Sequence, residues 1–150
     1  MVTELAAVAS VAVSLVALGV SLNVQREQRR CQDFELARSL HHDLTTGEVA
    51  QARDLLGTLV RSKEPIGGAA KHEALQAYFT LLWCFERIHV GHQTMGPGRP
   101  QRFLAEAVRW HVLEWDREIG AAKRKLEDRP GEIDDLHSRD GLAKLGEALR

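Results

Sequence analysis

The sequence is poor in the residues and motifs that carry chemistry in small enzymes and metal proteins. It holds two cysteines, one tyrosine and four prolines in 150 residues, and aromatic side chains make up only 5%. Cys31 and Cys84 fit neither a CxxC nor a Cys/His ligand spacing, which favours free thiols in a reducing compartment, with a single disulfide as the alternative. No phosphate-binding glycine loop, dinucleotide fingerprint or G-x-S-x-G elbow occurs, so these enzyme classes are not indicated.

Positive charge is also not in excess. The 20 basic residues face 21 acidic ones, for a net charge of -1, so nucleic acid is not expected as a partner. Of the basic residues 15 are Arg, a bias typical of high-GC bacterial genomes. The chain is long enough for one modest domain with one core. It contains no internal repeat and few β-branched residues after the first apolar run, which predicts an all-α fold.

The longest apolar run extends from Leu5 to Val24 and contains no charge over 20 residues. At about 1.5 Å per residue a helix of this length spans roughly 30 Å, the thickness of the hydrocarbon core of a bilayer. We therefore predict a transmembrane helix, whose serines and Asn23 weaken its insertion. A cleaved signal peptide and a buried soluble helix are the alternatives, although Glu4 is unlike the basic start of a signal peptide.

The residues around this run predict its orientation and its neighbours. The run is followed by three arginines, Arg26, Arg29 and Arg30. We therefore expect a cell-membrane protein with residues 1–4 outside and the helical domain in the cytoplasm. We also expect the arginines to lie beside anionic lipid. A second copy of the chain is a further expected partner, because small residues repeat at every fourth position (Ala6, Ser10, Ser14). The alternative is that Ala and Ser are simply abundant.

The remaining chain reads as a series of amphipathic helices. A stalk helix over 25–45 continues the membrane helix, a helical domain occupies 46–129, and 130–150 is a tail with a further short helix, in which Ser138 is the N-cap. Thr45 and Glu48 form a capping box for a helix that ends near Lys63. Helices over about 69–90 and from Pro100 complete a three- or four-helix antiparallel bundle. Whether the tail docks on it is open.

Large apolar side chains on the later helices are expected to form the core. Helical spacing of aromatic residues is far more often structural than a cofactor site, so we expect all three tryptophans there: Trp83, Trp110 and Trp115. Cys84 lies among apolar residues, which predicts a buried and unreactive thiol. The charged segment after Ala121 is expected to fray.

Two short patterns resemble the ligand motif of di-iron bundles: Glu86-x-x-His89 and His111-x-x-Glu114. In an ideal hairpin the two pairs are offset by nine residues, or about 13 Å along the helices, so they do not share one metal. We therefore predict no metal and no cofactor. Glu86 is expected instead to pair with Arg102 and Arg109 at the edge of the core.

Three segments carry a resemblance to small bacterial single-pass membrane proteins of unknown function: 52–56 (Ala-Arg-Asp-Leu-Leu), 85–87 (Phe-Glu-Arg) and 110–115 between two tryptophans. The resemblance implies a membrane helix and a cytosolic helical domain, and it implies no catalytic residue. We expect a membrane-anchored interaction or regulatory module with an unidentified protein partner. The alternatives are a metal-dependent or small-molecule-binding enzyme of the helical-bundle type, and a membrane-associated toxin, immunity or phage-defence component.

Overall fold

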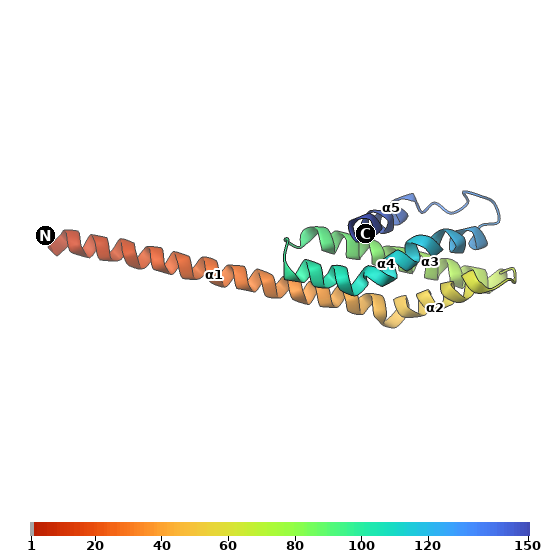
Figure 1. The fold of residues 1–150 in the computed structure, drawn as a ribbon, viewed down its shortest axis with the longest axis horizontal. Coiled ribbons are helices and arrows are strands. Elements are labelled where there is room, and N and C mark those ends of the chain that lie inside the picture. The colour runs from red at the N-terminus through yellow and green to blue at the C-terminus, as the bar shows by residue number, and fades with distance from the viewer. Residues whose placement is uncertain (1) are drawn as a thin grey trace.

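The computed structural model describes residues 2–150, with side chains from residue 17 onward. Its helices are α1 (Val2–Thr45), α2 (Gly47–Arg61), α3 (Gly68–Thr94), α4 (Arg99–Leu126) and α5 (Leu136–Ala148). All regular structure in the described residues is helical, so the all-α prediction is confirmed. Figure 1 shows the N-terminal part of α1 projecting alone from one end of a helical bundle.

Three rods of helix make up most of the bundle. The end of α1 and all of α2 follow one another in the same direction, α3 returns beside both, and α4 runs back again (Figure 1). Arg87 of α3 accordingly pairs with Asp43 of α1 at 2.7 Å, and Lys125 near the end of α4 bonds the end of α2. The predicted antiparallel packing therefore holds for α3 but not for α1 against α2.

The junction between α1 and α2 is a bend. The Thr45 hydroxyl donates to the His41 carbonyl at 2.9 Å, and the Thr46 hydroxyl donates to the His42 carbonyl at 2.8 Å, so both threonines serve the end of α1. Gly47 then adopts a φ of +60°, which glycine tolerates best. The N-cap of α2 is Thr46 and it makes no side-chain cap bond. The predicted capping box of Thr45 and Glu48 is thus wrong.

Side chains of α4 satisfy the carbonyls at the ends of two other helices. The Lys125 ammonium donates to the carbonyls of Leu59 at 2.7 Å and Val60 at 3.1 Å, and also to that of Ser62, at the end of α2. Gln101 donates to the His92 carbonyl near the end of α3 at 3.0 Å. A cation at a helix C-terminus also opposes the negative end of the helix dipole. The segment expected to fray is therefore helical to Leu126 and ties the bundle together.

A single core runs through the bundle. It is formed by buried apolar side chains from all five helices, among them Leu40, Leu56, Phe85, Val112 and Leu145. Trp115 belongs to it at 4% exposure, but Trp83 and Trp110 are 56% and 65% exposed, so the expectation of three core tryptophans is wrong for two of them. Cys84 is buried as predicted, and burial raises the pKa of its thiol to about 11.

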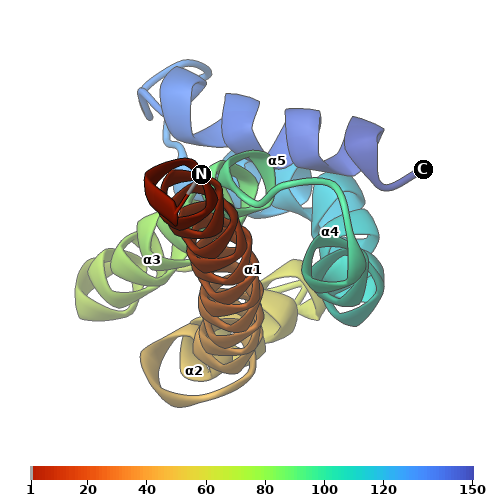
Figure 2. The same ribbon diagram turned by 90° about the vertical axis from the view of Figure 1, so that its left-hand side faces the viewer.

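The C-terminal tail docks on the bundle. α5 crosses α3 and α4 (Figure 2), and its buried face carries Leu142 and Leu145. Asp135, and not Ser138, is its N-cap. Gly141 permits the crossing, because a Cβ added there would lie 3.2 Å from the Cα of Glu86 on α3.

A Gly141→Ala variant tests this close approach. The methyl group would press on the backbone of α3, whose other side is core, and such overpacking costs about 1–3 kcal/mol. Gly120→Ala in α4 is the matched control, since its added carbon meets only arginine side-chain atoms at 3.6 Å. We expect Gly141→Ala to be less stable than Gly120→Ala by about 1–3 kcal/mol in urea titrations. Equal stability of the two variants would contradict the close contact.

The predicted transmembrane helix receives no support from the described residues, among which no helix is both long and apolar enough to cross a membrane. Residues 5–16 of the predicted span, and with them Ala6, Ser10 and Ser14, lie outside the part of the chain whose side chains are described. Residues 17–24 lie inside it, and all of their side chains are exposed.

Candidate functional site

The four residues weighed as metal ligands lie on two helices and do not form one cluster. Glu86 and His89 lie on α3, whereas His111 and Glu114 lie on α4. Burial lowers the pKa of His92, and its neighbour His89 lowers it further. Burial likewise lowers the pKa of His111, whose other contributions come from Arg53 and His41 and not from His89. Within the described residues, no group of three or more His, Cys, Asp and Glu side chains is placed to hold a metal ion.

The expected ion pairs of Glu86 do not form. No salt bridge among residues 17–150 joins Glu86 to Arg102 or Arg109. Glu86 packs instead against Gly141 of α5, where an added Cβ would lie 3.2 Å from the Glu86 Cα. Arg109 donates instead to the carbonyl of Arg150 at 3.2 Å. Arg102 lines a cleft beside the α3–α4 loop. The tail, whose docking the sequence left open, contacts both Glu86 and Arg109.

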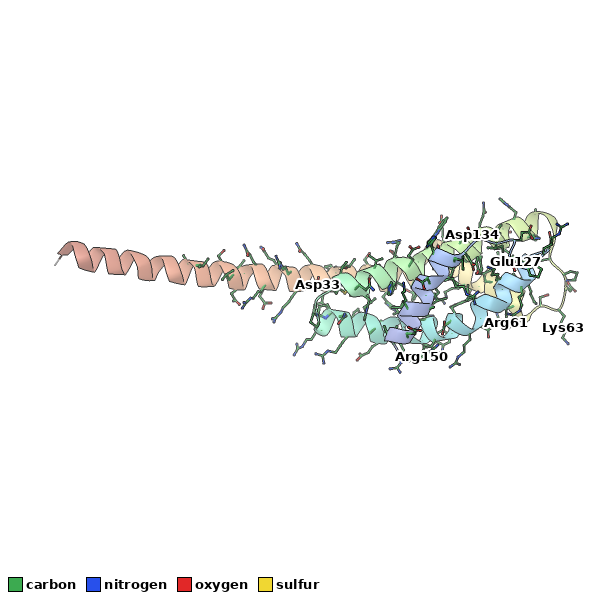
Figure 3. All side chains as sticks on the ribbon, turned by 90° about the horizontal axis from the view of Figure 1, so that it is seen from above. Asp33, Arg61, Lys63, Glu127, Asp134 and Arg150 are labelled. Carbon is green, nitrogen blue, oxygen red and sulfur yellow. The ribbon has the colours of Figure 1, made fainter. Side chains whose placement is uncertain are left out.

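The arginines that follow the apolar run lie on the exposed stalk. Arg30 pairs with Glu27 at 2.9 Å, with both side chains more than half exposed, and Arg26 and Arg29 are also exposed. Figure 3 shows charged side chains along this part of α1 up to Asp33, which is labelled near the end of the bundle. Exposed pairs of this kind contribute little to stability, so these arginines remain available to an anionic surface.

A buried polar network that was not predicted joins α3, α4 and the start of α5. Tyr78 donates to Asp135 Oδ2 at 2.5 Å, and the Lys123 ammonium donates to Asp135 Oδ1 at 2.5 Å. Lys123 also donates to the carbonyl of Ile133 at 2.9 Å and lies 3.6 Å from a carboxylate oxygen of Glu127. The side chains of Lys123 and Asp135 are only 16% and 1% exposed.

The ionisation of this network is fixed by its surroundings. Burial and the hydrogen bond to Asp135 raise the pKa of Tyr78 well above its usual value. Burial alone would raise the pKa of Asp135, but the hydrogen bonds from Lys123 and Tyr78 outweigh it and hold that pKa below its usual value. Tyr78 and Asp135 are buried, and only Lys123 of this hydrogen-bonded trio keeps appreciable contact with solvent. We call Tyr78, Lys123 and Asp135 the buried clip, because their hydrogen bonds hold the α4–α5 loop and α5 on the bundle. The buried clip is not arranged as a site for substrates.

The exposed tryptophans mark two hollows, one on either side of α2. Trp110 lies beside a hollow of about 340 Å³ between α2 and α4. Both signs of charge line it, with Arg53 and Arg61 from α2 and Glu114 and Glu118 from α4. Val60, Trp110 and Trp115 also line it, but the two signs of charge nearly balance, so the lining favours neither an anionic nor a cationic ligand.

Trp83 lies in a more uniform groove between α2 and α3. The groove consists of two adjoining hollows of about 620 and 660 Å³, which share Leu55 and Glu73. Its apolar wall includes Leu75, Phe79 and Ile66. The Phe79 and Trp83 rings lie next to each other, with their centroids 5.9 Å apart and their planes tilted by 34°. We call this feature the α2–α3 groove, and it is the best candidate for a functional surface.

The α2–α3 groove was not predicted, although its signal was present in the sequence. Phe79 and Trp83 are four residues apart on α3, which places them on one side of the helix. Trp83 lies on a different side of α3 from the buried residues Leu81, Cys84 and Phe85.

In comparisons with known proteins, no family model, no curated protein and no solved structure matches the chain.

Proposed function

We propose that the chain is a membrane-anchored helical interaction module. In this proposal the N-terminal part of α1 lies in the bilayer, and the bundle stands in the cytosol at the end of a helical stalk. The supporting observation is the exposed segment 17–24 of α1. It contains no charge, and Leu18 and Val20 are 57% and 59% exposed.

The large apolar residues of this segment lie on two opposite sides of the helix, and no charged residue lies between them. At 100° per residue, Leu18 and Val20 lie on nearly opposite sides of the helix, and Leu22 and Val24 repeat the two directions. A helix that packs one face on a protein and leaves the other in water carries its apolar residues on one side only, so this pattern favours burial of the whole segment. The bundle does not cover this segment, which projects away from it (Figure 1). Together with residues 5–16, it gives a stretch of the length that a bilayer requires.

The end of the bundle nearest the projecting segment is rich in arginine. Arg30 from the stalk and Arg99 and Arg102 from α4 line a cleft of about 650 Å³, which Glu27 and Asp33 also line. Each arginine near the surface of an anionic leaflet contributes about 1 kcal/mol to the free energy of membrane binding. This arrangement fits a domain that faces the cytoplasmic surface of the membrane, as the positive-inside rule expects.

Vesicle flotation of the full chain tests the proposal. The protein is synthesised in the presence of vesicles containing three parts phosphatidylcholine to one part phosphatidylglycerol. We expect it to float with the vesicles and to remain with them in 1 M salt and in alkaline carbonate, because its attachment is apolar. Protein that stays at the bottom of the gradient, or that carbonate releases, would overturn the anchor.

A further inference from the structure

The α2–α3 groove has a consistent charge as well as an apolar wall. Four acidic side chains line its two hollows, and all four are exposed: Glu48, Asp54, Glu64 and Glu73. No Lys, Arg or His side chain lines either hollow. The chain as a whole is nearly neutral, so this face differs from the rest of the molecule.

The dimensions of the groove suit one helix. It follows α2, which has 15 residues and is therefore about 22 Å long, or four helical turns. Its apolar side chains form a continuous path from Trp83 at one end to Ile66 and Pro65 at the other. Helix-in-groove recognition uses an apolar stripe at positions i, i+3 or i+4, and i+7 of the ligand. A partner of about four turns would cover this path.

We propose that the α2–α3 groove binds an amphipathic helix of a partner protein, with an apolar stripe flanked by Lys or Arg. The apolar stripe lies on Phe79, Leu75 and Leu55, and the indole of Trp83 closes one end of the groove. The basic flanks meet the four carboxylates, which steer the partner and set its specificity. This inference rests on the proposed function, because it names the partner class of the interaction module.

A peptide titration tests the groove separately from the anchor. The full chain is placed in nanodiscs of zwitterionic lipid, and empty nanodiscs give the background. The probe is a labelled 15-residue helix of Leu and Lys with Leu at every third or fourth position, and a second probe has Glu in place of Lys. We expect the Lys probe to bind at least tenfold more tightly than the Glu probe, and its binding to weaken as salt rises. Equal binding of the two probes would overturn the inference.

Paired variants locate the binding. Trp83→Ala removes an exposed ring from the groove, whereas Trp110→Ala removes a somewhat more exposed ring from the other side of α2, so neither change empties the core. We expect Trp83→Ala to weaken the Lys probe about tenfold, as a buried interface anchor does, and Trp110→Ala to leave it unchanged. Glu73→Lys should weaken binding of the Lys probe further, and Glu118→Lys on α4 is the control for this charge reversal. Equal effects within either pair would place the probe elsewhere.

The two proposals fail in different ways. If the chain does not float with vesicles, the same titration is run without nanodiscs and still reports on the groove. If flotation succeeds and the Lys probe does not discriminate Trp83→Ala from Trp110→Ala, the anchor stands and the basic-helix partner is wrong.

Discussion

Replacing Lys123 with methionine is expected to lower the free energy of unfolding by about 3–5 kcal/mol at pH 7. Lys123 is the only cation that hydrogen-bonds Asp135 in the described structure, and Asp135 is almost completely buried. Without the ammonium the buried carboxylate keeps the hydrogen bond from the Tyr78 hydroxyl and the charge of Arg139, but it loses its hydrogen-bonded cation. Since whole domains are stable by about 5–15 kcal/mol, a loss of this size is readily measured by chemical unfolding followed by circular dichroism.

The chain offers a matched control for this variant. Lys144 and Asp140 are also 2.5 Å apart, but both side chains are more than half exposed. Lys144→Met should therefore leave the stability unchanged within error, because exposed pairs contribute little. The double variant Lys123→Met, Asp135→Asn should recover most of the lost stability, because it removes both charges. Similar losses from Lys123→Met and Lys144→Met would contradict the account of the buried clip.

The same network predicts how stability depends on pH. Because the pKa of Asp135 is lower in the folded state than in the unfolded chain, its contribution is fully present above the unfolded value, which is about 3.9. It is lost as the pH falls below 4 through the folded pKa. In Lys123→Met the hydrogen bond that lowers the pKa of Asp135 is absent. The stability of this variant should therefore begin to fall at a higher pH than that of the unmodified protein. An unchanged acid limb of the stability curve would count against this assignment.

The second large effect is expected for Leu18→Asp. Leu18 lies about 5 Å from the centre of the run Leu5–Val24, and replacing Leu by Asp near the middle of a membrane helix costs about 3 kcal/mol. The serines and Asn23 already weaken insertion, so this cost is enough to reverse it. We expect the floated fraction to fall from most of the protein to little of it.

Gln28→Asp is the control for the flotation experiment. Gln28 is exposed on the same helix, beyond the apolar run, and the variant adds the same negative charge. It should float like the unmodified protein. If Leu18→Asp floats equally well, this part of α1 does not lie in the bilayer. If both variants fail to float, surface charge and not insertion governs the attachment.

The helices themselves were largely predictable from the sequence, because each carries a regular apolar period between recognisable breaks. Pro65, the glycine pair Gly67 and Gly68, and Pro100 mark the ends of α2, α3 and α4 closely. The direction of α2 was not predictable in this way. It depends on the hydrogen bonds of Thr45 and Thr46 to the end of α1 and on the positive φ of Gly47. The same residue types also suit an N-cap, so the local sequence does not distinguish the two arrangements.

The arrangement of polar residues was harder to predict. Lys123 and Lys125 lie in a segment with four other charged residues between Arg124 and Arg129, and nothing in the local sequence distinguishes a buried ammonium from a solvated one. The single tyrosine was the available signal, since a phenol in an apolar stripe requires a hydrogen-bond partner. That partner, Asp135, is 57 residues away and is reached only through the docked tail.

The exposure of Trp110 could have been predicted from the helical period of α4. The buried positions of α4 include Leu104, Val108, Val112 and Trp115, and Trp110 lies about 200° around the helix from Val108. Trp110 therefore belongs to the solvent face even before packing is considered. Trp83 is less clear, because α3 is apolar over most of its circumference and the edge of the buried face depends on where α2 ends.

The most direct test of the central claim is the labelling of Cys31 by a membrane-impermeant maleimide. Cys31 is exposed on the stalk seven residues after Val24, whereas Cys84 is buried with a raised pKa, so one thiol reports the topology. Right-side-out spheroplasts and washed inside-out vesicles are labelled in parallel, with Cys31→Ser as the blank. The account predicts labelling in the inside-out vesicles only. Labelling in spheroplasts, or absence of the protein from the washed vesicles, would contradict a membrane-anchored module that faces the cytosol.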